Sequence, residues 1–301
     1  YCSRRQRQMC IRDRYKSFYQ SHKKFIDSFI NNALIEDIGH IDHSSESCIP
    51  FDSYKSAKLI VKKSCIISGV ELAEKIFNQF DSNIVFKKFM NDGDFARSGS
   101  VAFTVKGKAK SILATERLVL NTMQRMSGIS TITQRLKNKI KNFNCKILDT
   151  RKTSPNFRYP EKWAVKIGGG ENHRMGLFDS IIIKDNHIDY CGGIKNTLLK
   201  VGKYLEKMKG KKPILIVEIR TLEEINDVVK FNFVDRILLD NMNPPKLKKA
   251  VKIINKKIKV EASGNINGSN IQKIAETGID YISLGAITHS APHIDLSLKA
   301  F

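Results

Sequence analysis

Residues 214–285 read ILIVEIRTLEEINDVVKFNFVDRILLDNMNPPKLKKAVKIINKKIKVEASGNINGSNIQKIAETGIDYISLG. Short apolar segments alternate here with segments whose apolar residues recur at the helical period. The four strand candidates are ILIVEI (214–219), RILLD (236–240), KVEAS (259–263) and YISLG (281–285). Repeated strand–helix units of this kind predict a parallel sheet with right-handed crossovers.

Two further strand candidates precede this region, KILDT at 146–150 and SIIIK at 180–184. The later strand ends recur at intervals of 22 or 23 residues, in the series Glu218, Asp240, Ser263 and Gly285. Even spacing favours a β/α barrel, but residues 146–287 number only 142, whereas an eight-unit barrel takes about 250. We therefore expect an incomplete, open barrel, with a doubly wound sheet as the alternative.

The chain before residue 128 follows another pattern, which predicts an α+β arrangement. Helices are expected at 15–38 and 70–80, and strands at 58–68, 84–90 and 101–109. Two more helices are expected at 115–127 and 129–140, separated at Gly128. The fold class is α/β: an N-terminal sandwich domain over 15–128, with 291–301 as a candidate addition, followed by a barrel domain over 129–290.

Residues 1–14, YCSRRQRQMCIRDR, resemble a translated sequencing adapter more than a protein segment. We interpret them as an adapter-derived artefact and exclude them; a genuine basic tail or targeting segment is the alternative. The formal net charge is +22, and removing their five arginines and one aspartate takes away +4 and leaves +18. Because the lysines are spread along the whole chain, we expect most of this charge on solvated surface.

The composition also bounds the cellular setting. The sequence has no run of about eighteen apolar residues, so we expect no membrane span. Beyond residue 14 there is no CxxC pair, so neither a zinc site nor a disulfide framework is indicated. We expect a reduced, cytoplasmic enzyme whose four cysteines are Cys48, Cys65, Cys145 and Cys191.

Each strand candidate of the barrel region ends in, or directly precedes, a residue suited to chemistry or phosphate binding. In barrels the carboxyl ends of the strands form the ligand-binding rim, so we expect these residues to converge. The loops SGN (263–265) and LGAITHS (284–290) place small residues before helices, where phosphates bind readily. Cations come first and carboxylates later, in the order Arg151, Lys152, His173, Arg174, Lys184, Glu218, Asp240. The set predicts a small polyanionic substrate that carries a sugar phosphate.

Other conspicuous residues have structural interpretations. Gly168–Gly170 follow a helical segment and indicate a helix stop rather than a phosphate cradle. His187 either caps a loop or binds a ligand. A metal site formed by Asp37, Asp42 and His43 stays open, although nothing in their spacing requires one.

The chain carries seven motifs in order: ATERLVLNTMQRMSGIST (114–131), ILDTRKTSP (147–155), KIGGGENHRMGLFDSIIIKDNH (166–187), VEIRTLEE (217–224), ILLDNM (237–242), VEASGNI (260–266) and YISLGAITHSAP (281–292). They resemble those of the quinolinate phosphoribosyltransferase family, also called carboxylating nicotinate-nucleotide pyrophosphorylases. The resemblance implies an N-terminal α/β sandwich, an incomplete barrel, and a homodimer or higher multiple whose active sites are shared between subunits. Arg117, in the first motif, is then expected to reach the partner's site.

The resemblance also implies residue roles. Quinolinate and phosphate would be bound by Thr150, Arg151, Lys152, His173, Arg174 and Lys184. Glu218 and Asp240 would lie near the ribose of phosphoribosyl pyrophosphate and hold Mg²⁺ through its pyrophosphate, and with Lys152 they are the expected catalytic residues. The 5-phosphate would be held by Ser263, Gly264, Asn265, Gly285 and Ala286. The loop EDIGHIDHSS (36–45) departs from the family, which commonly has a glycine before the aspartate.

The implied activity is that of a pentosyltransferase in NAD biosynthesis. It transfers a phosphoribosyl group to quinolinate with decarboxylation, giving nicotinate mononucleotide, pyrophosphate and CO₂, and needs no nucleophilic Ser or Cys. One alternative is a paralogue of the molybdate-operon type with another acceptor. The other, a nucleic-acid-binding protein, rests on charge alone and has no recognition helix to support it.

Overall fold

The computed structural model describes the backbone of residues 4–301 and the side chains from Phe18 onward. The side chains of residues 1–14, which we interpret as an artefact, lie outside the described part. The chain forms two compact units. Unit 1 comprises residues up to 134, 153–169 and 287–301, and unit 2 comprises 135–152 and 170–286. Residues 153–169, which we expected in the barrel domain, thus pack in unit 1.

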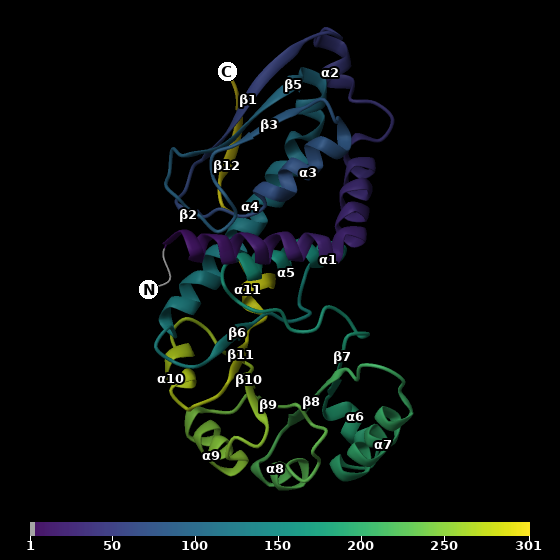
Figure 1. Ribbon diagram of the computed structural model, residues 1–301, viewed down its shortest axis with the longest axis vertical. Coiled ribbons are helices and arrows are strands. Elements are labelled where there is room, and N and C mark those ends of the chain that lie inside the picture. Colours follow the sequence, from purple (N-terminus) through teal and green to yellow (C-terminus); the bar gives the residue numbers. More distant parts are fainter. Residues whose placement is uncertain (1–3) are drawn as a thin grey trace. The chain divides into compact units, whose positions relative to one another are not determined.

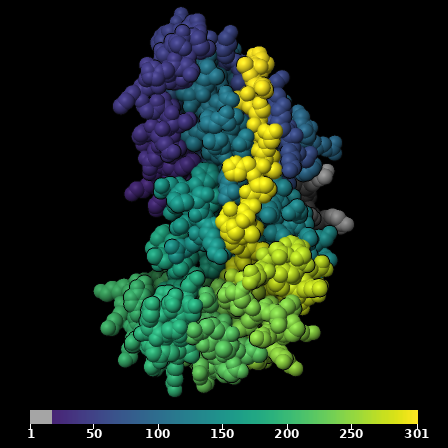
Figure 2. Space-filling model, turned by 180° about the vertical axis from the view of Figure 1, so that it is seen from behind, coloured from purple at the N-terminus to yellow at the C-terminus, as the bar shows by residue number. Residues whose placement is uncertain are grey.

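Unit 1 is built around an antiparallel sheet with strand order β12-β1-β5-β3 (Figure 1). Its strands are β1 (Tyr54–Val61), β3 (Val85–Lys88), β5 (Val101–Lys108) and β12 (Leu296–Ala300), and β2 (Cys65–Ile66) pairs separately with β4 (Phe95–Ala96). The C-terminal strand β12 runs at the surface of this unit and pairs with β1 (Figure 2). The expected strand 58–68 is therefore interrupted after Val61.

The helices of unit 1 are α1 (Arg4–Ile38, kinked at His22), α2 (His43–Cys48), α3 (Val70–Phe80), α4 (Ala109–Lys139) and α5 (Arg158–Ile167). Helix α3 buries one apolar stripe, in which Phe77 packs against Phe103 of the sheet. Asp42 accepts hydrogen bonds from the backbone N–H groups of Ser44 and Ser45, so its carboxylate caps α2.

Helix α4 corrects one expectation, because it is a single helix where the sequence predicted two. Gly128 does not end it. A Cβ atom at this position would lie 1.9 Å from the carbonyl oxygen of Pro292. Glycine is required there for close approach of the C-terminal segment, a packing demand that a local sequence pattern does not distinguish from a helix stop.

Unit 2 contains a six-stranded sheet in the order β6-β11-β10-β9-β8-β7, with every pairing parallel. The strands are β6 (Lys146–Leu148), β7 (Ser180–Ile183), β8 (Ile214–Ile219), β9 (Arg236–Asp240), β10 (Lys259–Ser263) and β11 (Tyr281–Ser283). From β7 to β11 neighbours follow chain order without the reversal of a doubly wound sheet. The sheet is an open barrel, interrupted between β6 and β7.

Helices flank these strands on the outer side (Figure 1). They are α6 (Asp185–Tyr190), α7 (Ile194–Lys207), α8 (Leu222–Val228), α9 (Pro244–Ile254) and α10 (Ile271–Ala275), and α11 (Ala286–His289) follows β11. Strands β8 and β9 contain continuous buried apolar runs, 215–217 and 237–239, as is usual in a parallel sheet, whereas β10 alternates apolar and polar residues. Within the described part, no helix is both long and apolar enough to cross a bilayer.

Candidate active site

The strand register brings the predicted strand-end residues to one edge and one face of the unit 2 sheet. Asp240 pairs with Ser263, and Glu218 pairs with Leu238, two residues before Asp240. Since side chains alternate across a strand, Glu218, Asp240 and Ser263 share the face opposite Val217 and Leu239. Lys184 follows β7 on the same face and extends it.

Glu218 lies at this edge between a cation and a second carboxylate. Its carboxylate Oε2 lies 3.9 Å from Lys184 Nζ, and its side chain is only 14% exposed. Burial raises the pKa of Glu218, and the negative charges of Asp240 and Asp185 raise it further, against the opposing effect of Lys184. Two carboxylates close enough to repel one another form a site that favours a cationic group or a metal ion.

The loops after β9 and β10 contain three residues with positive φ: Asn241 after β9, and Gly264 and Asn265 after β10. The Asn241 N–H donates to Ser263 O at 2.8 Å, and Asn265 Nδ2 donates to Asn241 Oδ1 at 3.0 Å. A Cβ atom on Gly264 would lie 2.2 Å from Asn241 Oδ1, so only glycine fits. The next helix begins at Ile271. Five residues (266–270) separate Asn265 from this helix, which therefore starts later than the expected phosphate contact with a helix N-terminus requires, so any phosphate contact here would come from the loop itself.

Gly285 and Ala286 follow β11. Ala286 begins α11, which has only four residues. A helix this short has little macrodipole, so the expected contribution of a helix N-terminus to phosphate binding is weak here as well.

Arg151 and Lys152 lie in an exposed turn after β6. The Lys152 N–H donates to Thr150 Oγ1 at 3.0 Å. Asp149, fully buried, accepts hydrogen bonds from Asn172 Nδ2 (2.6 Å) and the His173 N–H (2.8 Å). The buried carboxylate of Asp149 thus joins the β6 end to the segment that carries His173 and Arg174.

The His173 ring contacts protein groups through both nitrogens, and its side chain is 7% exposed. Nδ1 accepts from the Arg174 N–H at 2.8 Å, and Nε2 lies 3.4 Å from Glu261 Oε1. Arg236 Nη1 donates to Glu261 Oε2 at 2.8 Å and stacks over the Tyr281 ring. Burial alone would raise the pKa of Glu261, but hydrogen bonds and charge from His173 and Arg236 outweigh it and lower the pKa.

Arg174 completes the cationic part of the rim. Its Nη1 donates to Ser180 O at 3.2 Å. Burial lowers the pKa of Arg174, and repulsion from Arg151 lowers it further. Two guanidinium groups that repel one another favour an anion between them, and guanidinium groups bind carboxylates in bidentate fashion.

A family model described as the quinolinate phosphoribosyl transferase C-terminal domain matches residues 129–299, and the corresponding N-terminal domain model matches 42–127. The chain belongs to the quinolinate phosphoribosyltransferase family.

Similar proteins of this family come from plants and bacteria. A chloroplastic nicotinate-nucleotide pyrophosphorylase [carboxylating] of Oryza sativa subsp. japonica is 43% identical over 291 residues, covering 91% of this chain and 77% of the relative. A probable nicotinate-nucleotide pyrophosphorylase [carboxylating] of Bacillus subtilis is 37% identical over 273 residues, covering 91% and 92%. The solved nicotinate-nucleotide pyrophosphorylase of Francisella tularensis aligns with TM-score 0.85 at 37% identity, covering 92% and 96%.

Among the residues that the family resemblance pointed to, Arg117 stands apart. It is exposed on α4 in unit 1, whereas the other predicted site residues belong to unit 2. His187 caps α6, because its Nδ1 accepts from the Lys184 N–H at 3.0 Å. Gly168 and Gly169 end α5, as expected of a helix stop.

The sequence reading missed the buried polar groups beneath the rim, namely Asp149, Glu261 and Arg236. One signal was available: Glu261 interrupts the otherwise apolar centre of KVEAS. A charge in the middle of a buried strand needs partners, but the sequence does not say which. The described residues contain no cluster of three or more His, Cys, Asp or Glu side chains that could hold a metal ion, and Asp37, Asp42 and His43 are thus not one.

Proposed function

We propose that this chain transfers the phosphoribosyl group of phosphoribosyl pyrophosphate to quinolinate and releases pyrophosphate, CO₂ and nicotinate mononucleotide. The observation that carries the proposal is the set of charges at one edge of the sheet. The cations Arg151, Arg174 and Lys184 come first in the chain, and the carboxylates Glu218 and Asp240, on one face of neighbouring strands, follow. The names of the similar plant and bacterial proteins support it.

The charges of the substrates match this edge. Quinolinate is a dianion, and each terminal phosphate carries roughly −1.5 to −2. Arginine and lysine are needed to hold such anions together, and the mutual repulsion of Arg151 and Arg174 is relieved when an anion binds. We assign Lys152 to the same acceptor pocket.

The chemistry that we assign is displacement at C1 of the ribose. The C1–oxygen bond to pyrophosphate breaks while the quinolinate nitrogen forms a bond to C1. Glu218 and Asp240 stabilise the positive charge that develops at C1, because their carboxylates are fixed before the reaction. The bond from C2 of the ring to its carboxylate then breaks, CO₂ leaves, and the electron pair on C2 takes up a proton.

Magnesium would arrive with pyrophosphate and neutralise its charge as it leaves. The residues present fit this ion, because Mg²⁺ prefers carboxylate oxygens and takes only one or two from the protein beside phosphates and water. Glu218 and Asp240 supply two such groups on one face.

The shared active site and the cellular location are part of the same proposal. Arg117, exposed on α4, would complete the acceptor pocket of a second subunit. Mixing Arg117→Ala with Lys152→Ala protein should restore activity, because mixed dimers contain one intact site; no recovery would argue against sharing. The free state of Cys48, Cys65, Cys145 and Cys191 agrees with a cytoplasmic location.

The decisive test is an assay of pyrophosphate and CO₂ release with quinolinate and with nicotinate as acceptors. We expect turnover with quinolinate, and a large loss of kcat/KM in Lys152→Ala and Glu218→Ala. Activity with nicotinate alone would instead favour a paralogue with another acceptor. Unchanged kcat/KM in both variants would contradict the assigned rim.

A further inference from the structure

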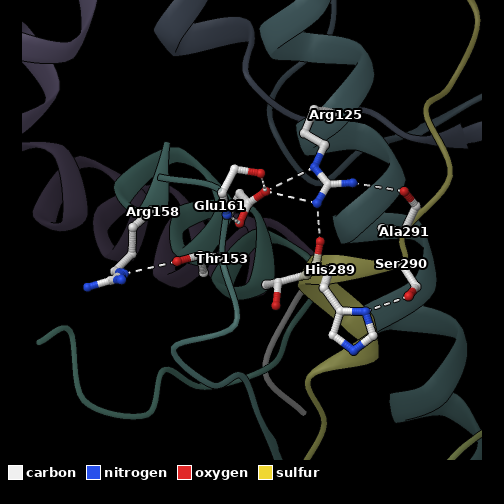
Figure 3. Close-up of polar contacts among 9 residues, drawn as sticks. Arg125, Thr153, Arg158, Glu161, His289, Ser290 and Ala291 are labelled. Atoms are coloured by element: carbon white, nitrogen blue, oxygen red, sulfur yellow. Dashed lines mark hydrogen bonds and ion pairs between the residues drawn. The ribbon is translucent and has the colours of Figure 1, made fainter. Parts of the chain in front are cut away.

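Outside the rim, a buried ion pair in unit 1 joins Arg125 of α4 to Glu161 of α5 (Figure 3). Arg125 Nε and Nη2 donate to Glu161 Oε1 at 3.0 and 2.9 Å. The Glu161 side chain is 0% exposed and that of Arg125 is 13% exposed. Desolvation offsets most of the attraction in a buried ion pair, so the pair contributes little net stability by itself. Its role is indicated instead by the other hydrogen bonds that Arg125 and Glu161 form.

Glu161 holds the chain that continues from the cationic turn. Ser154 donates to Glu161 through its N–H (3.1 Å, to Oε2) and through its hydroxyl (3.0 Å, to Oε1). Ser154 is only two residues beyond Lys152, and the intervening Thr153 accepts from Arg158 Nε at 2.9 Å (Figure 3). Both residues that follow Lys152 in the chain are therefore held by hydrogen bonds.

Arg125 holds the chain that continues from the loop after β11. Its Nη1 donates to Ala291 O at 2.9 Å (Figure 3). Its Nη2 also donates to Thr288 O. Thr288 is two residues beyond Ala286, which we assign to the 5-phosphate. One ion pair therefore holds the two segments of unit 1, at Ser154 and at 288–291, that follow the two ligand loops in the chain.

We propose that Arg125 and Glu161 are positioning residues for phosphoribosyl transfer, with Glu161 setting the acceptor loop through Ser154 and Arg125 setting the phosphate loop through Thr288. The inference rests on the proposed function. Reacting groups must be held within a fraction of an ångström, so a small shift of either loop is expected to weaken binding of its own substrate.

Ser154→Ala is the sharpest variant, because it removes one hydroxyl and leaves the ion pair in place. We expect KM for quinolinate to rise about tenfold, with KM for phosphoribosyl pyrophosphate unchanged, and calorimetric titration with quinolinate should show the same weakening. Ser130→Ala is the matched control: Ser130 Oγ donates to Ala164 O of α5 at 2.7 Å and holds no rim loop. It should lower Tm and leave both KM values unchanged.

Arg125→Lys extends the test to the second loop, because lysine keeps the charge but cannot donate to Glu161, Thr288 and Ala291 together. We expect both KM values to rise. Glu161→Gln should raise KM for quinolinate more than KM for phosphoribosyl pyrophosphate. If all three variants lower Tm as Ser130→Ala does and keep wild-type KM and Kd values, the pair is structural only and the inference is wrong. Absence of turnover in the wild-type protein would instead contradict the proposed function.

Discussion

The two halves of the rim are held in different ways. Glu218 and Asp240, the acidic half, belong to strands β8 and β9, each paired on both sides, so the sheet register fixes them. The cationic half (Arg151, Lys152, His173 and Arg174) lies in the connection between β6 and β7, the two strands at which the barrel is open.

In the cationic half the residues lie outside the paired strands, and hydrogen bonds to buried carboxylates hold the chain instead. Asp149 and Glu261 bind the segment that contains His173, and Glu161 binds the chain beyond Lys152. Buried anionic side chains thus hold the irregular chain that carries the cationic half. Changes to these buried acids should therefore affect stability and ligand binding together, whereas changes to the acidic half should affect catalysis alone.

The largest effect is expected for Glu261→Gln. Breaking a buried ion pair by removing one charge costs about 3–5 kcal/mol, and here Arg236 and His173 both lose an anionic partner. Urea denaturation should show a lower free energy of unfolding, with weaker quinolinate binding. Glu171→Gln is the control, since Glu171 pairs with Lys146 in an exposed bridge and should cost under about 1 kcal/mol. Equal losses of unfolding free energy in the two variants would contradict the structural role assigned to Glu261.

Glu218→Gln should reduce kcat/KM by about 10²–10³-fold, the cost of removing a preorganised electrostatic partner of the transition state. The shape of the side chain is kept and a half-buried charge is removed, so Tm should not fall. Glu223→Gln, exposed on α8, should leave the kinetics unchanged. A fall in Tm as large as that of Glu261→Gln would show that the acidic half also has a structural role.

Gly128→Ala tests whether close packing of α4 against Pro292 holds the chain beyond Ala286, in addition to the ion pair. The added Cβ would overlap Pro292 O, and overpacking of this kind costs about 1–3 kcal/mol. In Gly202→Ala the nearest atoms belong to the Phe233 ring at 3.2 Å, and the helix gains up to about 1 kcal/mol of propensity. Thermal unfolding should separate the two variants; equal Tm values would contradict the close approach.

The smallest expected effect is a shift in the pH dependence of kcat/KM. The proposed role of Glu218 needs its ionised form, so activity should fall as pH decreases through its raised pKa. Asp185 contributes to raising that pKa, and Asp185→Asn should therefore move the acid limb of the kcat/KM profile to lower pH. A shift to higher pH, or none, would show that the charge of Asp185 does not reach Glu218.

Strand-based features could be predicted from the sequence because their periodicity is local. Helix α3 has the predicted bounds Val70–Phe80, and the six barrel strands lie where short apolar runs indicated them. Glu218 and Asp240 were predicted at the carboxyl ends of such runs for the same reason, and they lie at the next-to-last position of β8 and at the last position of β9.

Features that depend on contacts distant in sequence could not be predicted. The role of Gly128 depends on Pro292, and the burial of Glu161 depends on Arg125 and Ser154. The packing of residues 153–169 in unit 1 has the same origin. Arg117 carries no local signal of function, and only the family resemblance pointed to it.

The opening between β6 and β7 has an evolutionary consequence. A closed barrel ties the number, tilt and stagger of its strands to one another, so an insertion at one position disturbs the whole. Here the connection between the first two strands lies outside the hydrogen-bonded ladder except for one bridge, between Leu148 and Glu171. Side-chain changes in the exposed turn of that connection leave the pairing of β8 and β9 untouched, so this scaffold can change its acceptor and retain the phosphoribosyl chemistry.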